Sequence, residues 1–154
     1  MRRASSASAA RRLAAVSWRD RALLLEAGTL LAVARLVALL VPFRFTSRLL
    51  GRRMAETPRE ELPASDRLRR MTWAIGAVAA RAPWRSQCLE QALAAKAMLR
   101  LRGIPSTLYL GVARADGGAQ PFDAHAWLRS GTVHVTGGRD VTRYAVVASF
   151  ADRP

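Results

Sequence analysis

The spacing of apolar residues changes at Gly103, and this change sets the fold class. Before Gly103, apolar residues recur with the helical period, as in the stripe formed by Leu68, Met71, Ile75 and Val78. After Gly103, segments 104–114, 122–129 and 132–138 alternate apolar and polar residues, with glycine-containing turns between them. We therefore expect an α+β fold in which helices come first and an antiparallel meander follows.

The longest predicted helix begins after Ser17, a good N-cap, and ends before Pro42. Residues 22–41 within it are long enough to cross a bilayer. However, Glu26 and Arg35 lie nine positions apart, on opposite sides of the helix, so they cannot pair with each other. An arginine at the middle of a span costs about 2.5–3.5 kcal/mol. We favour a helix packed on the domain or on a partner, with Arg35 snorkelling, over a membrane span.

The composition bounds the partners and the compartment. The chain has 154 residues and a net charge of +14, and Lys96 is the one lysine among 25 basic residues. The preference for arginine over lysine is as typical of a GC-rich genome as of selection for a partner. A net charge of this size nevertheless favours anionic partners. No aromatic interleaving or reading helix accompanies it, so nucleic acid is not predicted. A single cysteine excludes an internal disulfide and a cysteine-based zinc cluster, and it fits a reducing compartment.

Changes in composition divide the chain into three parts. Residues 1–16 consist mainly of Arg, Ser and Ala and are predicted to be a disordered basic tail without a clear cleavage site. Residues 17–64 form a helical docking region with a short basic helix and a linker at about 52–64. Residues 65–154 form the core, beginning with a helix that Ser65 or Asp66 caps and that runs to about Ala80.

The single cysteine lies at the start of a predicted helix. Ser86 is the expected N-cap, which places Cys88 in the first turn, and Gly103 is a good residue for the helix end. A buried structural cysteine is one interpretation. The other is a nucleophile, because a helix N-terminus favours a thiolate. His125 lies on a predicted strand between small alanines and is the candidate base, close to Cys88 in space.

Several motifs in this region resemble one family. The segment "WRSQCL" precedes a helix, "RGIP" breaks it, "LYLGVAR" follows, and "AHAW" contains His125. Together these residues resemble the transglutaminase-like cysteine peptidases that remove leader peptides in lasso-peptide biosynthesis. The resemblance implies an N-terminal helical region and a papain-like core with a helix packed on an antiparallel sheet. It also implies that Cys88 and His125 act together with an aspartate from a neighbouring strand.

The third member of the predicted triad is less well defined by the sequence. A two-residue turn at Ser130–Gly131 would place His125 opposite Thr136, not opposite an acid. A bulge at the following glycines could return Asp140 to the imidazole, and we predict Asp140 as the third catalytic residue. Asp123, one pleat away, and the Thr136 hydroxyl are the alternatives.

His134 is interpreted as a surface or cross-strand partner of Trp127. With no cysteine or carboxylate spaced to join it, neither a metal site nor a cofactor is predicted. Backbone N–H groups at the start of the Cys88 helix, with Gln87 or Ser86, are the expected oxyanion donors.

The resemblance implies a cytoplasmic or membrane-associated peptidase that cleaves a ribosomally made precursor peptide. Its expected partners are a small leader-binding protein and the ATP-dependent lasso cyclase, with the N-terminal helix as a docking surface. Two alternatives stay open. One is an acyltransferase or amidase with the same Cys–His pair, in which an amine replaces water. The other is a non-catalytic basic adaptor at a membrane or nucleic acid, in which Cys88 is merely buried.

Overall fold

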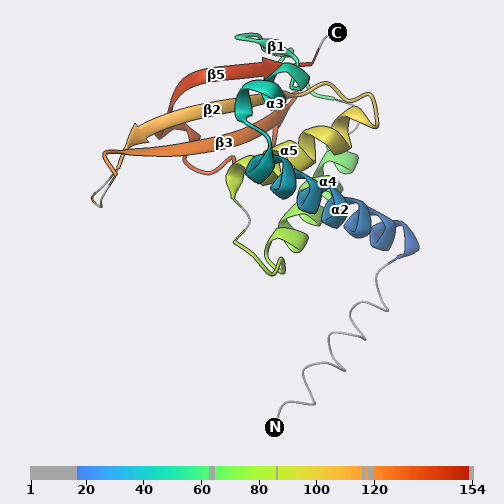
Figure 1. The fold of residues 1–154 in the computed structure, drawn as a ribbon. Helices are drawn as coiled ribbons and strands as arrows, with labels where there is room; N and C mark the ends of the chain where they lie inside the picture. Colours follow the sequence, from blue (N-terminus) through green and yellow to red (C-terminus); the bar gives the residue numbers. More distant parts are fainter. Residues whose placement is uncertain (1–16, 63–64, 86, 116, 118–119, 153–154) are drawn as a thin grey trace.

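The fold is α+β, as the change of period predicts. The computed structural model describes residues 17–62, 65–85, 87–115, 117 and 120–152, so the predicted tail at 1–16 lies outside the described residues. Within this part of the chain, a helical N-terminal region precedes an antiparallel sheet of order β1-β5-β2-β3-β4 (Figure 1). The elements are α2 (Trp18–Leu40), α3 (Phe43–Leu49), β1 (Arg52–Arg53), α4 (Ser65–Ala79), α5 (Cys88–Arg100), β2 (Thr107–Arg114), β3 (Phe122–Ser130), β4 (Val133–Thr136), the short 3-10 helix η1 (Val141–Arg143) and β5 (Ala145–Ala151).

Helices α4 and α5 pack on one face of the sheet, and α2 packs on both of them (Figure 1). The side of α5 that meets the sheet carries Ala92, Ala95 and Leu99, all fully buried. Small alanines let the helix approach the strands closely. The core that results includes the predicted α4 stripe and the inward residues of β2 and β3, such as Leu108 and Leu128.

Two ion pairs fasten α2 to α5 and to the turn that follows it. Glu26 accepts two hydrogen bonds from Arg102, each 2.6 Å long, and Arg35 donates to Glu90 over 2.6 Å. The prediction that Glu26 and Arg35 do not pair with each other is confirmed, but Arg35 binds Glu90 where snorkelling to solvent was expected. In the described part of the chain, α2 is the one helix with the length and composition of a membrane span.

The stretch predicted as a linker contains a strand and crosses the end of the sheet. Arg52 and Arg53 form β1 and pair with β5, and Thr57 is buried, with its N–H donating to Thr107 Oγ1. Arg129 of β3 is 3% exposed and donates to backbone carbonyls of this stretch, including Thr57 O at 2.9 Å. These bonds fix the stretch against the sheet, and the predicted domain boundary at residue 64 stays a prediction.

The end of β5 is held to α5 by a buried charged group. Lys96 is 1% exposed and lies 3.1 Å from Asp152, which also accepts from Arg100 and from Ser106. Burial alone would raise the pKa of Asp152. The charge of Lys96 and the hydrogen bonds from its neighbours outweigh that effect and hold this pKa below its ordinary value of 3.8.

The lowered pKa of Asp152 predicts how stability depends on pH. A carboxyl whose folded pKa is depressed stabilises the fold above its unfolded pKa and loses this contribution as the pH falls through its folded value. We expect Asp152→Asn to lower the free energy of unfolding most at neutral pH. The difference from wild type should shrink below about pH 3.8. Urea unfolding at a series of pH values measures this difference, and a gap that stays constant with pH would contradict the assignment.

Candidate active site

Cys88 is the first residue of α5. The N-cap is Gln87 and not the predicted Ser86, which lies outside the described residues. The Gln87 side chain accepts the N–H of Glu90, and the Glu90 side chain accepts the N–H of Gln87, which completes a capping box. The thiol of Cys88 is half-buried. The placement of Cys88 in the first turn is therefore confirmed, with a different cap.

Glu90 also fixes the loop that leads into the cysteine. It is 2% exposed, and besides the Gln87 N–H it binds Arg35 of α2 at 2.6 Å and Trp84 Nε1 at 3.3 Å. The carboxylate thus joins α2, the loop and the first turn of α5. A group that holds the backbone on both sides of Cys88 restricts where the thiol can lie.

Removing the cation beside Glu90 should destabilise the protein. We expect Arg35→Met to lower the free energy of unfolding by about 3 kcal/mol, because the buried carboxylate loses its charged partner. Arg69→Met is the matched control, since Arg69 pairs with Asp66 on the surface. Its expected cost is under about 0.5 kcal/mol. Urea unfolding of both variants tests this, and equal costs would show that the Arg35–Glu90 pair has no special weight.

The thiol meets the sheet at a free edge of β3. The strand β4 pairs with β3 only from Leu128 onward, so Ala126 faces no β4 partner. The N–H of Ala126 instead donates to Cys88 Sγ at 3.4 Å. Because Ala126 follows His125 directly, the Cys88 thiol lies beside the backbone of the strand segment that carries His125.

The imidazole of His125 is oriented by a backbone carbonyl. Its Nε2 lies 2.7 Å from the carbonyl oxygen of Gly137. A carbonyl only accepts hydrogen bonds, so Nε2 carries the proton and a neutral ring leaves Nδ1 as the acceptor. An imidazole held in this way presents a basic nitrogen on the side away from Gly137.

The hairpin between β3 and β4 differs from the predicted one. Ser130 pairs with Val133, so the turn residues are Gly131 and Thr132, and a bulge follows between Leu128 and Arg129. Gly131 has φ +56°, which suits the turn. The predicted turn at Ser130–Gly131 was wrong by one residue, because Gly131, which has the positive φ, is the first residue of the turn and not the second.

The new register moves the predicted partners of His125. Thr136 faces Leu128, and its hydroxyl is buried with no partner in the described structure. His134 faces Arg129 where Trp127 was expected. Asp140 is exposed on the loop after β4, and the carbonyl of Gly137 occupies the position at Nε2 that we predicted for its carboxylate.

Asp123 is bound to a tyrosine that the sequence analysis missed. Tyr144 donates to Asp123 Oδ2 at 2.7 Å, and its ring centre lies 5.0 Å from that of His125. This hydrogen bond raises the pKa of Tyr144, with smaller contributions from desolvation and from the charges of Asp123 and Cys88. Tyr144 therefore forms one wall of the site, and Asp123 binds Tyr144 beside the imidazole.

Aromatic rings continue this wall along the sheet. Trp127 stacks between His125 and Tyr109, with ring centres 5.9 and 5.3 Å away. Gly111 makes the arrangement possible, because a Cβ there would lie 2.8 Å from the Trp127 ring and 2.9 Å from Tyr144. Gly111 pairs with His125 across β2 and β3. A glycine at this position of the sequence is a signal that could have indicated the close packing of the rings.

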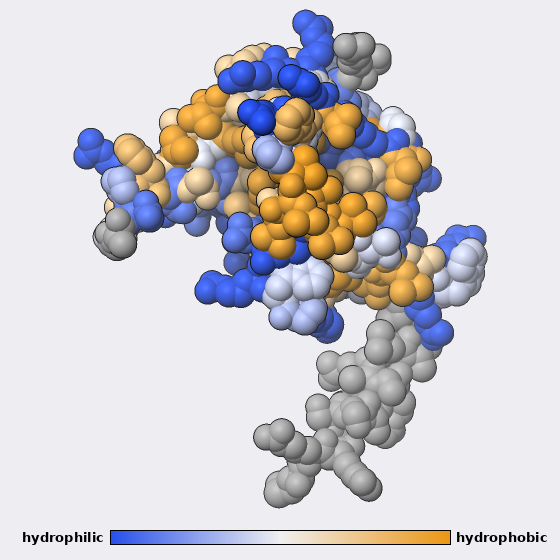
Figure 2. All heavy atoms as spheres, viewed as in Figure 1, coloured by the Kyte–Doolittle hydropathy of each residue, from blue (hydrophilic) through white to orange (hydrophobic). Residues whose placement is uncertain are grey.

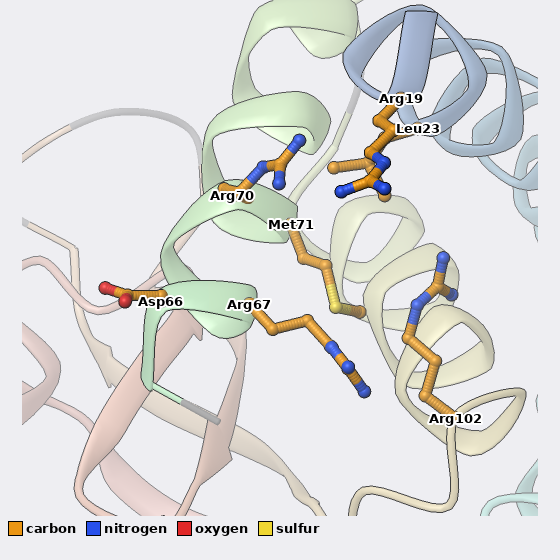
Figure 3. Close-up of a pocket in the computed structure, with 7 residues that line it drawn as sticks. All are labelled: Arg19, Leu23, Asp66, Arg67, Arg70, Met71 and Arg102. Carbon is orange, nitrogen blue, oxygen red and sulfur yellow. The ribbon is translucent and has the colours of Figure 1, made fainter. Parts of the chain in front are cut away.

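Two hollows differ in their relation to the thiol. One, of about 330 Å³, opens beside His125 and is lined by Thr72 of α4 and the loop after β4. The other, of about 560 Å³, lies between α2, α4 and the end of α5, where Arg19, Arg67 and Arg102 extend over it (Figure 3). Arg102 follows Cys88 by fourteen residues, about 20 Å along the chain of α5 and its end. The arginine-lined hollow is therefore separate from the site.

The fold and the site together define an α+β domain with a cysteine at a helix start and a histidine on the adjoining strand. Among the described residues, no group of three or more His, Cys, Asp or Glu side chains is arranged to hold a metal ion. The profile of the transglutaminase-like superfamily matches residues 30–149. The chain belongs to this superfamily. No curated protein and no solved structure matches the chain.

Proposed function

We propose that this protein is a cysteine peptidase that removes the leader from a ribosomally made precursor peptide in lasso-peptide biosynthesis. One observation carries the cysteine chemistry: Cys88 Sγ is bonded to the N–H of Ala126, next to an imidazole whose Nε2–H is held by Gly137. The superfamily match supports a fold of the cysteine-protease and acyltransferase type. The specific substrate class rests on the motifs around Cys88 and His125.

The proposed reaction is acyl transfer to sulfur. Nδ1 of His125 takes the thiol proton, and Sγ of Cys88 attacks the carbonyl carbon of the scissile bond. The tetrahedral intermediate collapses, the C–N bond breaks, and the imidazolium gives its proton to the leaving amine. Water, deprotonated by the same nitrogen, then hydrolyses the thioester, which releases the leader's carboxylate and regenerates the thiol.

Donors for the oxyanion come from the start of α5. The backbone N–H groups of Cys88 and Leu89 belong to the first turn, which has no intrahelical acceptors for them. The side-chain oxygen of Gln87 accepts in the capping box, which leaves its amide NH2 group as a further donor. We assign the stabilisation of the oxyanion to the two backbone groups, with the Gln87 amide as a third donor.

The proposed partners follow from the resemblance to the lasso leader peptidases. A separate small leader-binding protein is proposed to present the precursor. The ATP-dependent cyclase that closes the lasso ring would take the released core peptide. These steps are placed in the cytoplasm, where the precursor is made, and nucleic acid has no role in them.

The test is a cleavage assay with purified components. The protein, the leader-binding protein and a precursor peptide encoded beside it are incubated together and analysed by mass spectrometry. Two fragments whose masses sum to the precursor plus one water support the peptidase. A leader fragment that carries an added amine would favour the acyltransferase. An intact precursor, together with a Cys88 thiol that reacts slowly with iodoacetamide, would favour the non-catalytic adaptor.

A further inference from the structure

The outer side of α2 is apolar and uncovered. At 100° per residue, the six large exposed apolar side chains of α2 fall within about 120° of arc, opposite the buried residues Ala27, Leu31 and Ala34. The large apolar side chains on this arc are between 48 and 75% exposed: Trp18, Leu25, Val33, Leu36, Leu39 and Leu40. Only 17% of the most apolar window of the helix is buried, unlike a core helix.

Helix α3 extends this surface. Phe43, Phe45 and Leu49 are exposed directly after α2, and Figure 2 shows apolar side chains gathered over α2 and α3. We call the six side chains of the arc together with these three the apolar face. A contiguous exposed patch of this kind marks an interaction site in a folded protein.

The charges around the apolar face are positive. Both acidic residues of α2 are already paired with arginines of the domain, since Asp20 binds Arg70 and Glu26 binds Arg102. On α3 and β1 the flanking charges are Arg44, Arg48, Arg52 and Arg53, all exposed. Such a surface is complementary to an anionic one, and a second copy of the chain would bring arginine against arginine.

Aromatic and basic residues lie where a membrane interface would need them. Trp18 is at one end of the apolar face, and Phe45 is at the other, with Arg44 and Arg48 within cation–π distance of its ring. Tryptophan and arginine at the edges of an apolar helix face are typical of helices that lie in the headgroup region.

The ion pairs of α2 favour a helix that lies on a membrane over one that crosses it. A helix that left the domain to span a bilayer would take Glu26 and Arg35 into hydrocarbon and would leave Glu90 buried without its cation. We propose that α2 stays docked on α5 and that the apolar face binds the surface of a membrane that contains anionic lipid.

Vesicle sedimentation with the full chain tests this proposal. We expect the protein to bind vesicles of phosphatidylcholine with phosphatidylglycerol, to bind pure phosphatidylcholine weakly, and to be released by carbonate. Arg44→Gln/Arg48→Gln should weaken binding about 25-fold, since each basic residue at an anionic surface contributes a factor of about five. Leu36→Gln/Leu40→Gln should weaken it at least tenfold, because both side chains are exposed apolar surface.

Matched controls keep the test independent of folding. Arg114→Gln/Arg139→Gln and Leu101→Gln change exposed residues outside the apolar face and should bind as wild type does. Circular dichroism checks each variant. The fluorescence of Trp18 reports contact with lipid while all the leucines of the apolar face stay in place. Brominated lipid should quench this fluorescence in the wild-type protein, and the quenching should disappear in Trp18→Phe.

Four outcomes would overturn the proposal. They are no binding to anionic vesicles, binding that neither double variant weakens, and binding that resists carbonate, which would indicate a span. The fourth is a lipid-free dimer that Leu36→Gln/Leu40→Gln dissociates, which would make a second copy the occupant. Cleavage of the precursor is measured separately, so failure of the membrane proposal leaves the peptidase proposal standing.

Discussion

Cys88→Ala and His125→Ala are each expected to reduce the rate of precursor cleavage by about 10⁴-fold or more. The reason is that the sulfur forms the covalent bond and the imidazole moves the proton in both halves of the reaction. Because the two act as one unit, the double variant should be no slower than either single variant. Single-turnover cleavage followed by mass spectrometry measures all three.

Folding must be shown to survive these changes. Cys88 Sγ accepts one weak hydrogen bond from Ala126, and His125 is only partly buried. The free energy of unfolding of each variant should therefore lie within about 1 kcal/mol of the wild-type value. A folded Cys88→Ala protein that cleaves near the wild-type rate would end the peptidase proposal. A His125→Ala protein that keeps its rate would show that another base deprotonates the thiol.

Local patterns predicted the helices well. Ser17 caps α2 as expected, and its side chain accepts the N–H of Asp20, because both groups lie within one turn. The stripe of α4 and the alternation of β2 and β3 also reflect near neighbours in the sequence. The pair of Arg35 with Glu90, which is 55 residues away, depends on how two helices pack, and no local pattern reports it.

The last strands were harder to predict. The run that forms β5 is short and apolar, and its periodicity does not separate a strand from a buried helix turn. Strand β1 has two residues and exists only through its pairing with β5. Both segments become strands because the rest of the fold provides a neighbouring strand with which their backbones can pair.

The sequence predicted the elements that carry Cys88 and His125, whose catalytic roles stay predictions, and did not predict the acceptor that binds the imidazole. The sequence placed Cys88 at a helix start and His125 on a strand, and in the structure the thiol lies beside the backbone of that strand. The acceptor at Nε2 is the carbonyl of Gly137, and every residue has a carbonyl, so side-chain patterns carry no signal for it. The β3–β4 turn lies one residue later than predicted and a bulge follows it, and together these two shifts move Thr136 and Asp140 away from their predicted positions.

Gly137→Ala should lower the maximal cleavage rate by at least about a hundredfold, the effect expected when a catalytic group is displaced by about 1 Å. A Cβ at Gly137 would lie 2.5 Å from Ala126 O and 3.1 Å from His125 Nε2, so the loop and the ring must move apart. Asp140→Asn, which changes an exposed carboxylate, should stay within about twofold of wild type.

Gly103→Ala is the matched control for backbone strain. Gly103 has φ +64° and Gly137 has φ +65°, but a Cβ at Gly103 meets no atom within 4 Å. Both alanines should therefore cost about 1–2 kcal/mol of stability from the left-handed backbone, and only Gly137→Ala should lose rate. If Asp140→Asn is slow and Gly137→Ala is not, Asp140 orients His125 in the working enzyme and the carbonyl assignment is wrong.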